Sequence, residues 1–176
     1  EKLENTWKEL NTLEPAFFSV TYGAGGSTRD NTFDIVKTMK EQGIDVAPHL
    51  SFGGDDEASM TKLLDDYKAL GVNRIVALRG DIPSGMGMSR IVYANELVEF
   101  IRQHSGDHFE LEVASYPEIH PESDSYITDI DFLKKKLDAG ADSSITQYFF
   151  NADAYFYFLE ECQKAGIDKP IYPGVM

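Results

Sequence analysis

An apolar run in this 176-residue chain ends in two opposite charges. The run Ile75-Val76-Ala77-Leu78 stops at Arg79-Gly80-Asp81. A guanidinium can hold a phosphate through two parallel hydrogen bonds, and a carboxylate beside it stays ionised. The triplet therefore predicts a site for an anionic ligand, where Asp81 accepts a hydrogen bond or places negative charge against an electron-rich ring. A cell-adhesion role is disfavoured, because the triplet ends a buried strand.

Other apolar runs also end in polar or ionisable residues. Taken singly, each such residue is at least as easily explained as part of a solvated loop. Several polar ends on successive runs instead favour a shared site at one end of a sheet. The further residues are Thr21-Tyr22-Gly23, His49, Tyr116-Pro117-Glu118 with His120, and Gln147.

Two kinds of chemistry lack the spacing that they need. His49, Asp81, Glu118 and His120 are conceivable metal ligands, but they form no H-x-H or H-E-x-x-H pair, so we predict no metal site. Nucleophilic catalysis is disfavoured too, because no G-x-S-x-G segment or Cys/His pair is present. The single cysteine, Cys162, lies in a helical pattern, where a free thiol is usually a small buried hydrophobe.

Two segments bear on an anionic cofactor. Lys134, Lys135 and Lys136 form a basic run on a predicted helix. Successive helical residues are about 100° apart, so at most two can face one ligand, and we assign Lys134 to the solvated face. The Gly-rich segment 23–32 enters a helix and can bind an anion, although it lacks P-loop spacing.

A repeated pattern predicts the elements that position these residues. Six apolar runs begin 27 to 37 residues apart, the size of one βα unit. Runs that are apolar throughout suit parallel strands buried on both faces. The runs are "AFFSVTYG", "DVAPHLSF", "RIVALRGD", "LEVASYPE", "SITQYFF" and "PIYPGV". Helical patterns cover residues 1–13, 28–43, 56–71, 127–140 and 152–166, and the last four each stop at a glycine.

This alternation fits an open doubly wound sheet or a (β/α)₈ barrel. We favour the barrel, because no G-x-G-x-x-G follows the first run. The pattern begins with a helix and ends with a strand. We therefore predict an α/β fold of the (β/α)₈ TIM-barrel type, present as a fragment that lacks the first strand and the last βα units. Residues 1–176 are expected to form a single, partial catalytic domain.

The composition limits the kinds of binding partner and the cellular compartment that we expect for this protein. The net charge of −14 argues against broad binding to nucleic acid or anionic lipid. The longest apolar runs are too short to span a membrane, and the charged N-terminal segment does not resemble a signal peptide. One cysteine fits a reducing compartment. We therefore expect a cytoplasmic protein that binds a small molecule.

The strand-end residues also belong to longer motifs. Particularly specific are "RGD-x-P", "YPE-x-HPE" and "DAGA-x-x-x-ITQ-x-FF", which occur with "SVTYGAGGSTRD", "APHL" and Tyr93-Ala94. In order and spacing, across essentially the whole chain, they resemble the methylenetetrahydrofolate reductase family of the bacterial, FAD-dependent type. The resemblance implies a barrel flavoenzyme of one-carbon metabolism and methionine biosynthesis. NADH or NADPH reduces its FAD, and 5,10-methylenetetrahydrofolate then accepts the hydride to give 5-methyltetrahydrofolate.

The resemblance also implies roles for residues. Asp81 would lie near flavin and folate as the catalytic carboxylate, and Gln147 would bind the pterin beside Phe149 or Phe150. Family members are commonly homo-oligomers. The implied FAD contacts are Thr21, His49, Arg79, Gly80, Asp81, Tyr93, Ala94, Tyr116, His120, Asp129, Lys135 and Lys136.

One departure from the family keeps alternatives open. Its general acid is a Glu in a first-strand segment like "FEFFPP", which these residues do not contain. Glu118 and Glu122 are present, but their motif does not match. A flavin- or folate-binding fragment without full catalysis is therefore one alternative. A barrel lyase acting on phosphate-bearing substrates is another, although no apolar run carries the Schiff-base lysine near its end. No motif distinguishes NADH from NADPH.

Overall fold

The computed structural model describes residues 2–21, 27–52, 56–79 and 93–176. Its centre is a sheet of six parallel strands in the order β1-β2-β3-β4-β5-β6. Neighbours in sequence are neighbours in the sheet throughout, whereas a doubly wound sheet reverses its strand order. The predicted barrel type of fold is therefore confirmed, and the six strands form a half-barrel. The strands are β1 (Phe18–Val20), β2 (Val46–Leu50), β3 (Arg74–Ala77), β4 (Glu110–Ser115), β5 (Ser143–Thr146) and β6 (Ile171–Tyr172).

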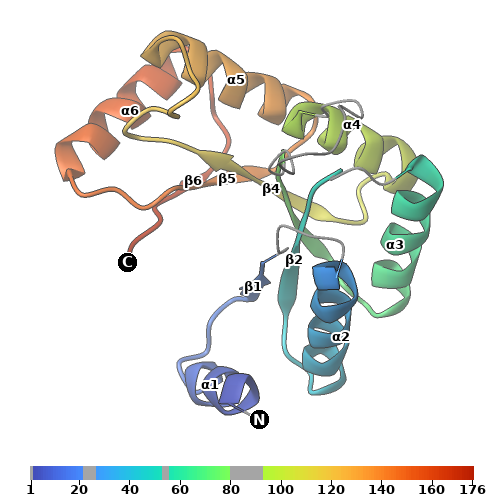
Figure 1. Cartoon of the computed structure of the whole chain (residues 1–176). Coiled ribbons are helices and arrows are strands. Elements are labelled where there is room, and N and C mark those ends of the chain that lie inside the picture. The colour runs from blue at the N-terminus through green and yellow to red at the C-terminus, as the bar shows by residue number, and fades with distance from the viewer. Residues whose placement is uncertain (1, 22–26, 53–55, 80–92) are drawn as a thin grey trace.

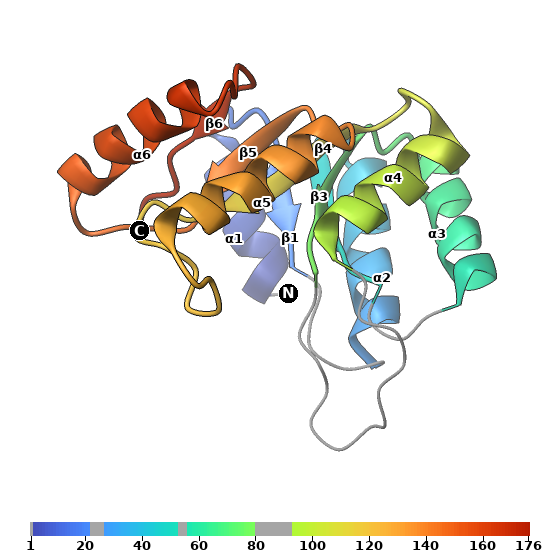
Figure 2. The same ribbon diagram turned by 90° about the horizontal axis from the view of Figure 1, so that it is seen from above.

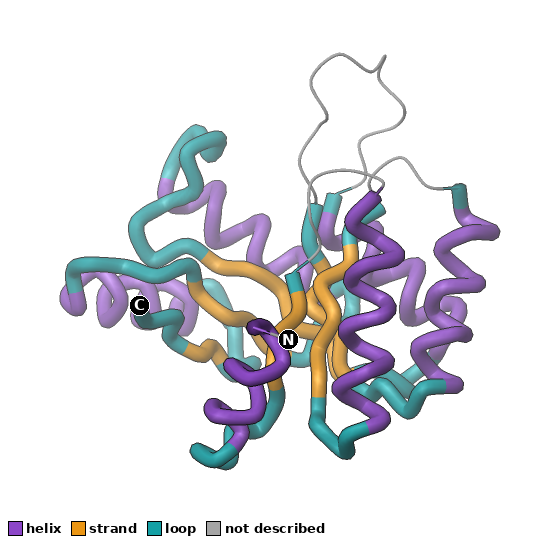
Figure 3. The backbone as a smooth tube through the Cα atoms, turned by 60° about the horizontal axis from the view of Figure 1, so that its bottom comes forward, coloured by secondary structure: helices purple, strands orange, loops and turns teal. Residues whose placement is uncertain are grey.

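Helices α2 to α6 follow one another round the convex side of this sheet (Figure 1). Seen from above, α3 to α6 lie together on its outer side (Figure 2), and the strands form one curved layer (Figure 3). No helix in the described residues is long and apolar enough to cross a membrane. The helices are α1 (Lys2–Asn11), α2 (Ser27–Glu41), α3 (Glu57–Ala69), α4 (Ala94–Ser105), α5 (Tyr126–Asp138) and α6 (Ala152–Lys164).

The predicted strands and helices are confirmed, with one omission. Each of the six apolar runs contains a strand. The glycines predicted to end four helices, at positions 43, 71, 140 and 166, all have positive φ, as expected just beyond a helix end. Helix α4, whose Leu97, Val98 and Ile101 are fully buried, was not predicted. This helix occupies the longest interval between two runs.

The two faces of the sheet are distinguished by strand register. Side chains alternate between faces along a strand. One face carries apolar side chains that join the helices in the core, including Leu50, Ile75, Leu111 and Val113. The other, concave face carries the alternate set. Its members, by pairing, are Ser19, Ala47, His49, Arg74, Val76, Glu110, Glu112, Ala114, Ser143, Ile145 and Tyr172.

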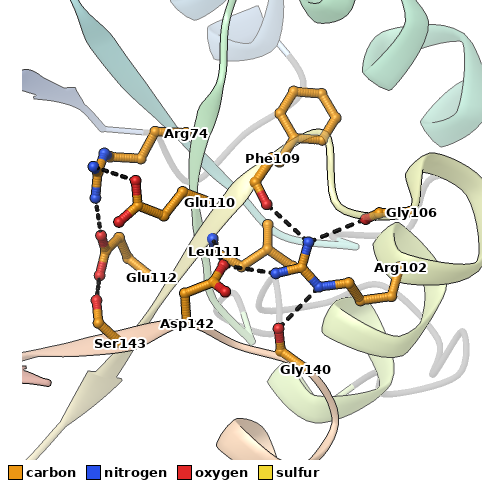
Figure 4. Close-up of polar contacts among 10 residues, drawn as sticks. All are labelled: Arg74, Arg102, Gly106, Phe109, Glu110, Leu111, Glu112, Gly140, Asp142 and Ser143. Atoms are coloured by element: carbon orange, nitrogen blue, oxygen red, sulfur yellow. Dashed lines mark hydrogen bonds and ion pairs between the residues drawn. The ribbon is translucent and has the colours of Figure 1, made fainter. Parts of the chain in front are cut away.

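A polar network joins loops at the amino ends of β4 and β5 (Figure 4). Arg102, near the end of α4, donates to the carbonyl oxygens of Gly140 (2.9 Å), Gly106 (3.0 Å) and Phe109 (2.8 Å). It also pairs with Asp142 at 2.6 Å, and that carboxylate accepts the Leu111 N–H at 2.7 Å. One guanidinium thus satisfies backbone groups from two αβ connections.

A second network lies on the concave face (Figure 4). Arg74 pairs with Glu110 and with Glu112, and Glu112 also accepts the Ser143 hydroxyl. Glu112 is fully buried, and its contacts with Arg74 and Ser143 offset the cost of burying a carboxylate. Arg74 also lies 4.6 Å from the centre of the Phe17 ring. The network links β3, β4 and β5 towards their amino ends.

Replacing Arg102 with alanine should lower the free energy of unfolding by about 2–4 kcal/mol, because it leaves Asp142 and several carbonyls without their donor. Urea denaturation followed by circular dichroism measures the loss. Lys62→Ala is the control, since it removes only an exposed ion pair with Asp66 and should cost less than about 0.5 kcal/mol. Equal losses in the two variants would show that Arg102 is merely a surface residue.

Candidate functional site

Four of the predicted site residues share one register at the carboxyl ends of the strands. His49 pairs with Val76 on the concave face. Thr21 follows Ser19 by two residues, Tyr116 follows Ala114, and Gln147 follows Ile145, each of which belongs to the same face. The Gln147 N–H still donates to the Ser115 carbonyl at 2.8 Å, so the ladder continues to this point. In (β/α)₈ barrels this rim carries the active site.

Arg79 and Glu122 form an ion pair at the rim. Arg79 Nη1 lies 2.6 Å from Glu122 Oε2. The hydrogen bond that Arg79 donates to Glu122 raises the pKa of Arg79, and Tyr93 and Tyr116 are close enough to contribute. The same contact lowers the pKa of Glu122. The rim therefore holds a fixed cation that already has an anionic partner 43 residues away in sequence, which spacing alone did not predict.

His120 is held in one orientation by its surroundings. Its ring Nδ1 accepts the backbone N–H of Glu122 at 3.1 Å, and the backbone N–H of His120 donates to the Asp129 carboxylate at 3.0 Å. The ring packs edge-on against Tyr116, with centroids 4.6 Å apart. Since Nδ1 accepts, the neutral ring carries its proton on Nε2. His120 can thus present an N–H donor to a ligand, while Asp129 binds the backbone of His120.

The three lysines of α5 diverge, as helix geometry requires. Lys134 pairs with Asp138 at 3.3 Å. Lys135 is exposed, with its ammonium 5.0 Å from the centre of the Phe132 ring. Lys136 points inward and donates to the Ala114 carbonyl at the end of β4. Burial lowers its pKa to about 8, although Asp129 opposes this shift.

The segment after β5 is tied to the loop after β4. Glu118 Oε1 accepts the N–H groups of Phe150 (3.4 Å) and Asn151 (3.3 Å) at the start of α6. Phe149 stacks on Tyr155 with centroids 4.9 Å apart, whereas the Phe150 side chain is 90% exposed. Phe149 is therefore the packing residue of the two, and Phe150 is available for contact. This link from Glu118 to the start of α6 was not predicted. The one sequence feature that points to Glu118 is its position two residues after Tyr116.

The remaining predicted residues lie around this rim. The half-buried His49 has a pKa lowered by burial, so its ring is neutral at pH 7. Thr21 accepts the Thr32 hydroxyl through its carbonyl at 3.1 Å. Tyr93, half exposed, donates its N–H to Glu96 at 2.8 Å just before α4, and Ala94 is the first residue of that helix. Gly80, Asp81 and part of the Gly-rich segment lie outside the described residues.

Two other sequence expectations concern metals and thiol chemistry. Within the described ranges, no three His, Cys, Asp or Glu side chains lie close enough together to hold a metal ion. The Cys162 side chain is 1% exposed, and burial raises the pKa of its thiol to about 12. The interpretation of Cys162 as a small buried hydrophobe is confirmed, because a thiol in this state is not a nucleophile.

Comparison with known proteins decides the family. The profile described as "Methylenetetrahydrofolate reductase" matches residues 1–176. The chain belongs to this family. It is 41% identical to the 5,10-methylenetetrahydrofolate reductase of Escherichia coli (strain K12) and 42% to that of Pectobacterium carotovorum subsp. carotovorum, each over 177 residues and 100% of this chain. It is 34% identical to "Methylenetetrahydrofolate reductase (NADH) 1" of Zea mays over 194 residues, which cover 100% of this chain and 33% of that protein.

The chain spans 59% of the length of the Escherichia coli relative and 58% of the Pectobacterium one. Solved structures with the same fold include a phosphonopyruvate hydrolase, with TM-score 0.59 and 12% identity over 83% of this chain and 59% of that chain. Another is a putative lyase/mutase from Burkholderia cenocepacia J2315, with TM-score 0.59 and 16% identity over 92% and 62% of the two chains. Such low identities show the barrel-like fold alone.

Lys136 should make the stability of this family member depend on pH. Its folded pKa of about 8 lies below the ordinary lysine value of about 10.4. The unfolded chain then binds more protons between these values, so stability rises with pH across this range. The free energy of unfolding of the unmodified protein, measured relative to that of Lys136→Met, should increase by about 2 kcal/mol from pH 7 to pH 9.5.

Urea denaturation at several pH values measures this difference. Lys135→Met is the matched control: it removes an exposed neighbouring charge, so its difference from the unmodified protein should stay constant with pH. A constant difference for Lys136→Met as well would contradict the burial of the Lys136 ammonium.

Proposed function

We propose that the protein catalyses FAD-dependent reduction of 5,10-methylenetetrahydrofolate to 5-methyltetrahydrofolate, with NADH or NADPH as the electron donor in a ping-pong cycle. Family membership over residues 1–176 supports the reaction class. The observation that carries the proposal is that His49 in β2 and the residues directly after β1, β4 and β5, which are Thr21, Tyr116 and Gln147, follow the concave register at the carboxyl rim. We further propose that the chain acts as a single barrel domain of a cytoplasmic homo-oligomer in one-carbon metabolism and methionine biosynthesis.

The charged and hydrogen-bonding side chains near the rim are of the kinds that FAD needs. In a chain of net charge −14, Arg79, Lys135 and Lys136 are the cations proposed to bind the pyrophosphate; in the free protein the two lysines point in different directions from α5. His120 offers an N–H donor, and His49 is a neutral, half-buried ring. The residues proposed to hold FAD are Thr21, His49, Arg79, Gly80, Asp81, Tyr93, Ala94, Tyr116, His120, Asp129, Lys135 and Lys136.

When bound, FAD supplies the hydride-transfer chemistry, while protein groups orient the reactants and set the charge around them. Gln147 is proposed to hydrogen-bond the pterin, with the exposed Phe150 beside it. Opening the five-membered ring of the folate develops positive charge, which the carboxylate of Asp81 would stabilise. Glu118, bound to the start of α6, and Glu122, bound to Arg79, already have structural partners, and neither is proposed as the general acid.

Because Glu118 and Glu122 both have structural partners, a second candidate function is also supported. A protein that binds FAD or folate through this rim without completing catalysis would need the same cations and donors but no acid. The lyase alternative receives less support, because no described strand end carries a lysine for a Schiff base. Its resemblance to solved lyase folds rests on fold alone.

The direct test of the proposed function is a visible absorption spectrum of the purified protein before and after addition of FAD. Binding should give a retained flavin spectrum after gel filtration. Turnover with NADH or NADPH and methylenetetrahydrofolate then separates the reductase from the binding-only candidate. A preparation that stays colourless and retains no added FAD would refute the reductase and any flavin-binding role.

Asp81→Asn should slow the two half-reactions unequally. The carboxylate is proposed to stabilise cationic charge on the folate, so folate reduction should fall by at least about tenfold, the equivalent of about 1.4 kcal/mol of transition-state stabilisation. Flavin reduction by the nicotinamide should change less. Stopped-flow absorbance measures the half-reactions separately, and equal slowing of both would exclude this electrostatic role.

A further inference from the structure

We propose that Glu122 is an internal competitor for Arg79: its carboxylate occupies the guanidinium in the free protein, and a phosphate of the cofactor must displace it. This inference rests on the proposed function, because it takes FAD as the ligand of Arg79. It adds a residue that lowers cofactor affinity, where the other rim residues are expected to raise it.

The geometry of the pair matches that of a phosphate contact. Glu122 Oε2 lies 2.6 Å from Arg79 Nη1, close to the range of charge-assisted hydrogen bonds to carboxylate or phosphate oxygens. A phosphate held through two parallel hydrogen bonds can also use Nη1. Because two anions this close together repel each other, a carboxylate on the same nitrogen disfavours binding of the phosphate.

The main chain around Glu122 is held independently of its carboxylate. The Glu122 N–H donates to His120 Nδ1, and the Ser123 N–H donates to the His120 carbonyl at 2.9 Å. The Ser123 hydroxyl also donates to Asp129 at 3.0 Å. These bonds keep the turn in place if the ion pair breaks, so displacement needs only a rotation of the Glu122 side chain.

The carboxylate can leave at low cost. The Glu122 side chain is 61% exposed and that of Arg79 is 35% exposed, so water can solvate the released carboxylate. Exposed ion pairs of this kind change an equilibrium constant by about two- to fivefold. The competing contact should therefore weaken FAD binding by about that factor at low salt, and the effect should fade as salt screens the pair.

The opposite role is also physically reasonable and gives the opposite sign. If Glu122 served to orient Arg79 for the cofactor, its removal would loosen the guanidinium and weaken binding. The bond from Nη1 to a solvent-exposed carboxylate favours competition, because the pair uses one of the nitrogens that a phosphate can bind. The sign of the affinity change therefore distinguishes the two roles.

The experiment titrates the purified full chain with FAD, measuring flavin fluorescence, at about 0.01 M and about 1 M salt. Glu122→Gln should bind FAD about two- to fivefold more tightly at low salt and equally at high salt. Glu9→Gln, on exposed α1, removes one negative charge elsewhere and should leave the affinity unchanged. Unchanged or weaker FAD binding by Glu122→Gln would overturn the inference while leaving the proposed function intact.

A double-mutant cycle tests whether Glu122 acts through Arg79. In an Arg79→Gln background, Glu122→Gln should leave FAD affinity unchanged. An equal gain in both backgrounds would show a general charge effect and overturn the competition. If neither the unmodified protein nor any variant binds FAD, the proposed function fails and the inference fails with it.

Discussion

Parallel strand pairing is the constraint on which the site depends. All six strands run in one direction, so their carboxyl ends collect at a single rim, and the two-residue alternation decides which side chains face the concave side. The pairs His49–Val76 and Ala114–Ile145 fix the phase of this alternation. A slip of one residue in any strand would turn its rim residue towards the helices. The separated polar residues of the sequence lie at one rim only because this register holds across the sheet.

The two ends of the sheet carry different kinds of polar group. At the amino ends, Arg102 binds several backbone carbonyls and Arg74 neutralises the buried Glu112. These groups have their partners within the protein, which suits a stabilising role. At the carboxyl rim, the Arg79–Glu122 pair is exposed to solvent and His120 presents its Nε2. This exposure to solvent is what the proposed exchange of a protein partner for a ligand requires.

Much of the architecture could be predicted from the sequence, because apolar runs and terminal glycines are local signals. Helix α4 was missed although its core face is apolar, since Tyr93 before it is not one of the usual Ser, Thr, Asp or Asn caps. The candidate rim residues were also recognisable as polar ends of apolar runs. Their partners were not, because the contacts of Glu122 with Arg79 and of Lys136 with Ala114 join distant segments. Sequence spacing does not reveal which charges are already neutralised within the fold.

Amide hydrogen exchange with and without FAD tests most directly whether one rim of the sheet forms the cofactor site. Backbone amides at the carboxyl ends, around residues 78–79, 116–120 and 147, should exchange more slowly when FAD is present. Amides at the opposite ends, around residues 106–111 and 140–142, should exchange at unchanged rates. Protection confined to the amino ends, or no protection at the rim under conditions where FAD is bound, would contradict the placement of the site.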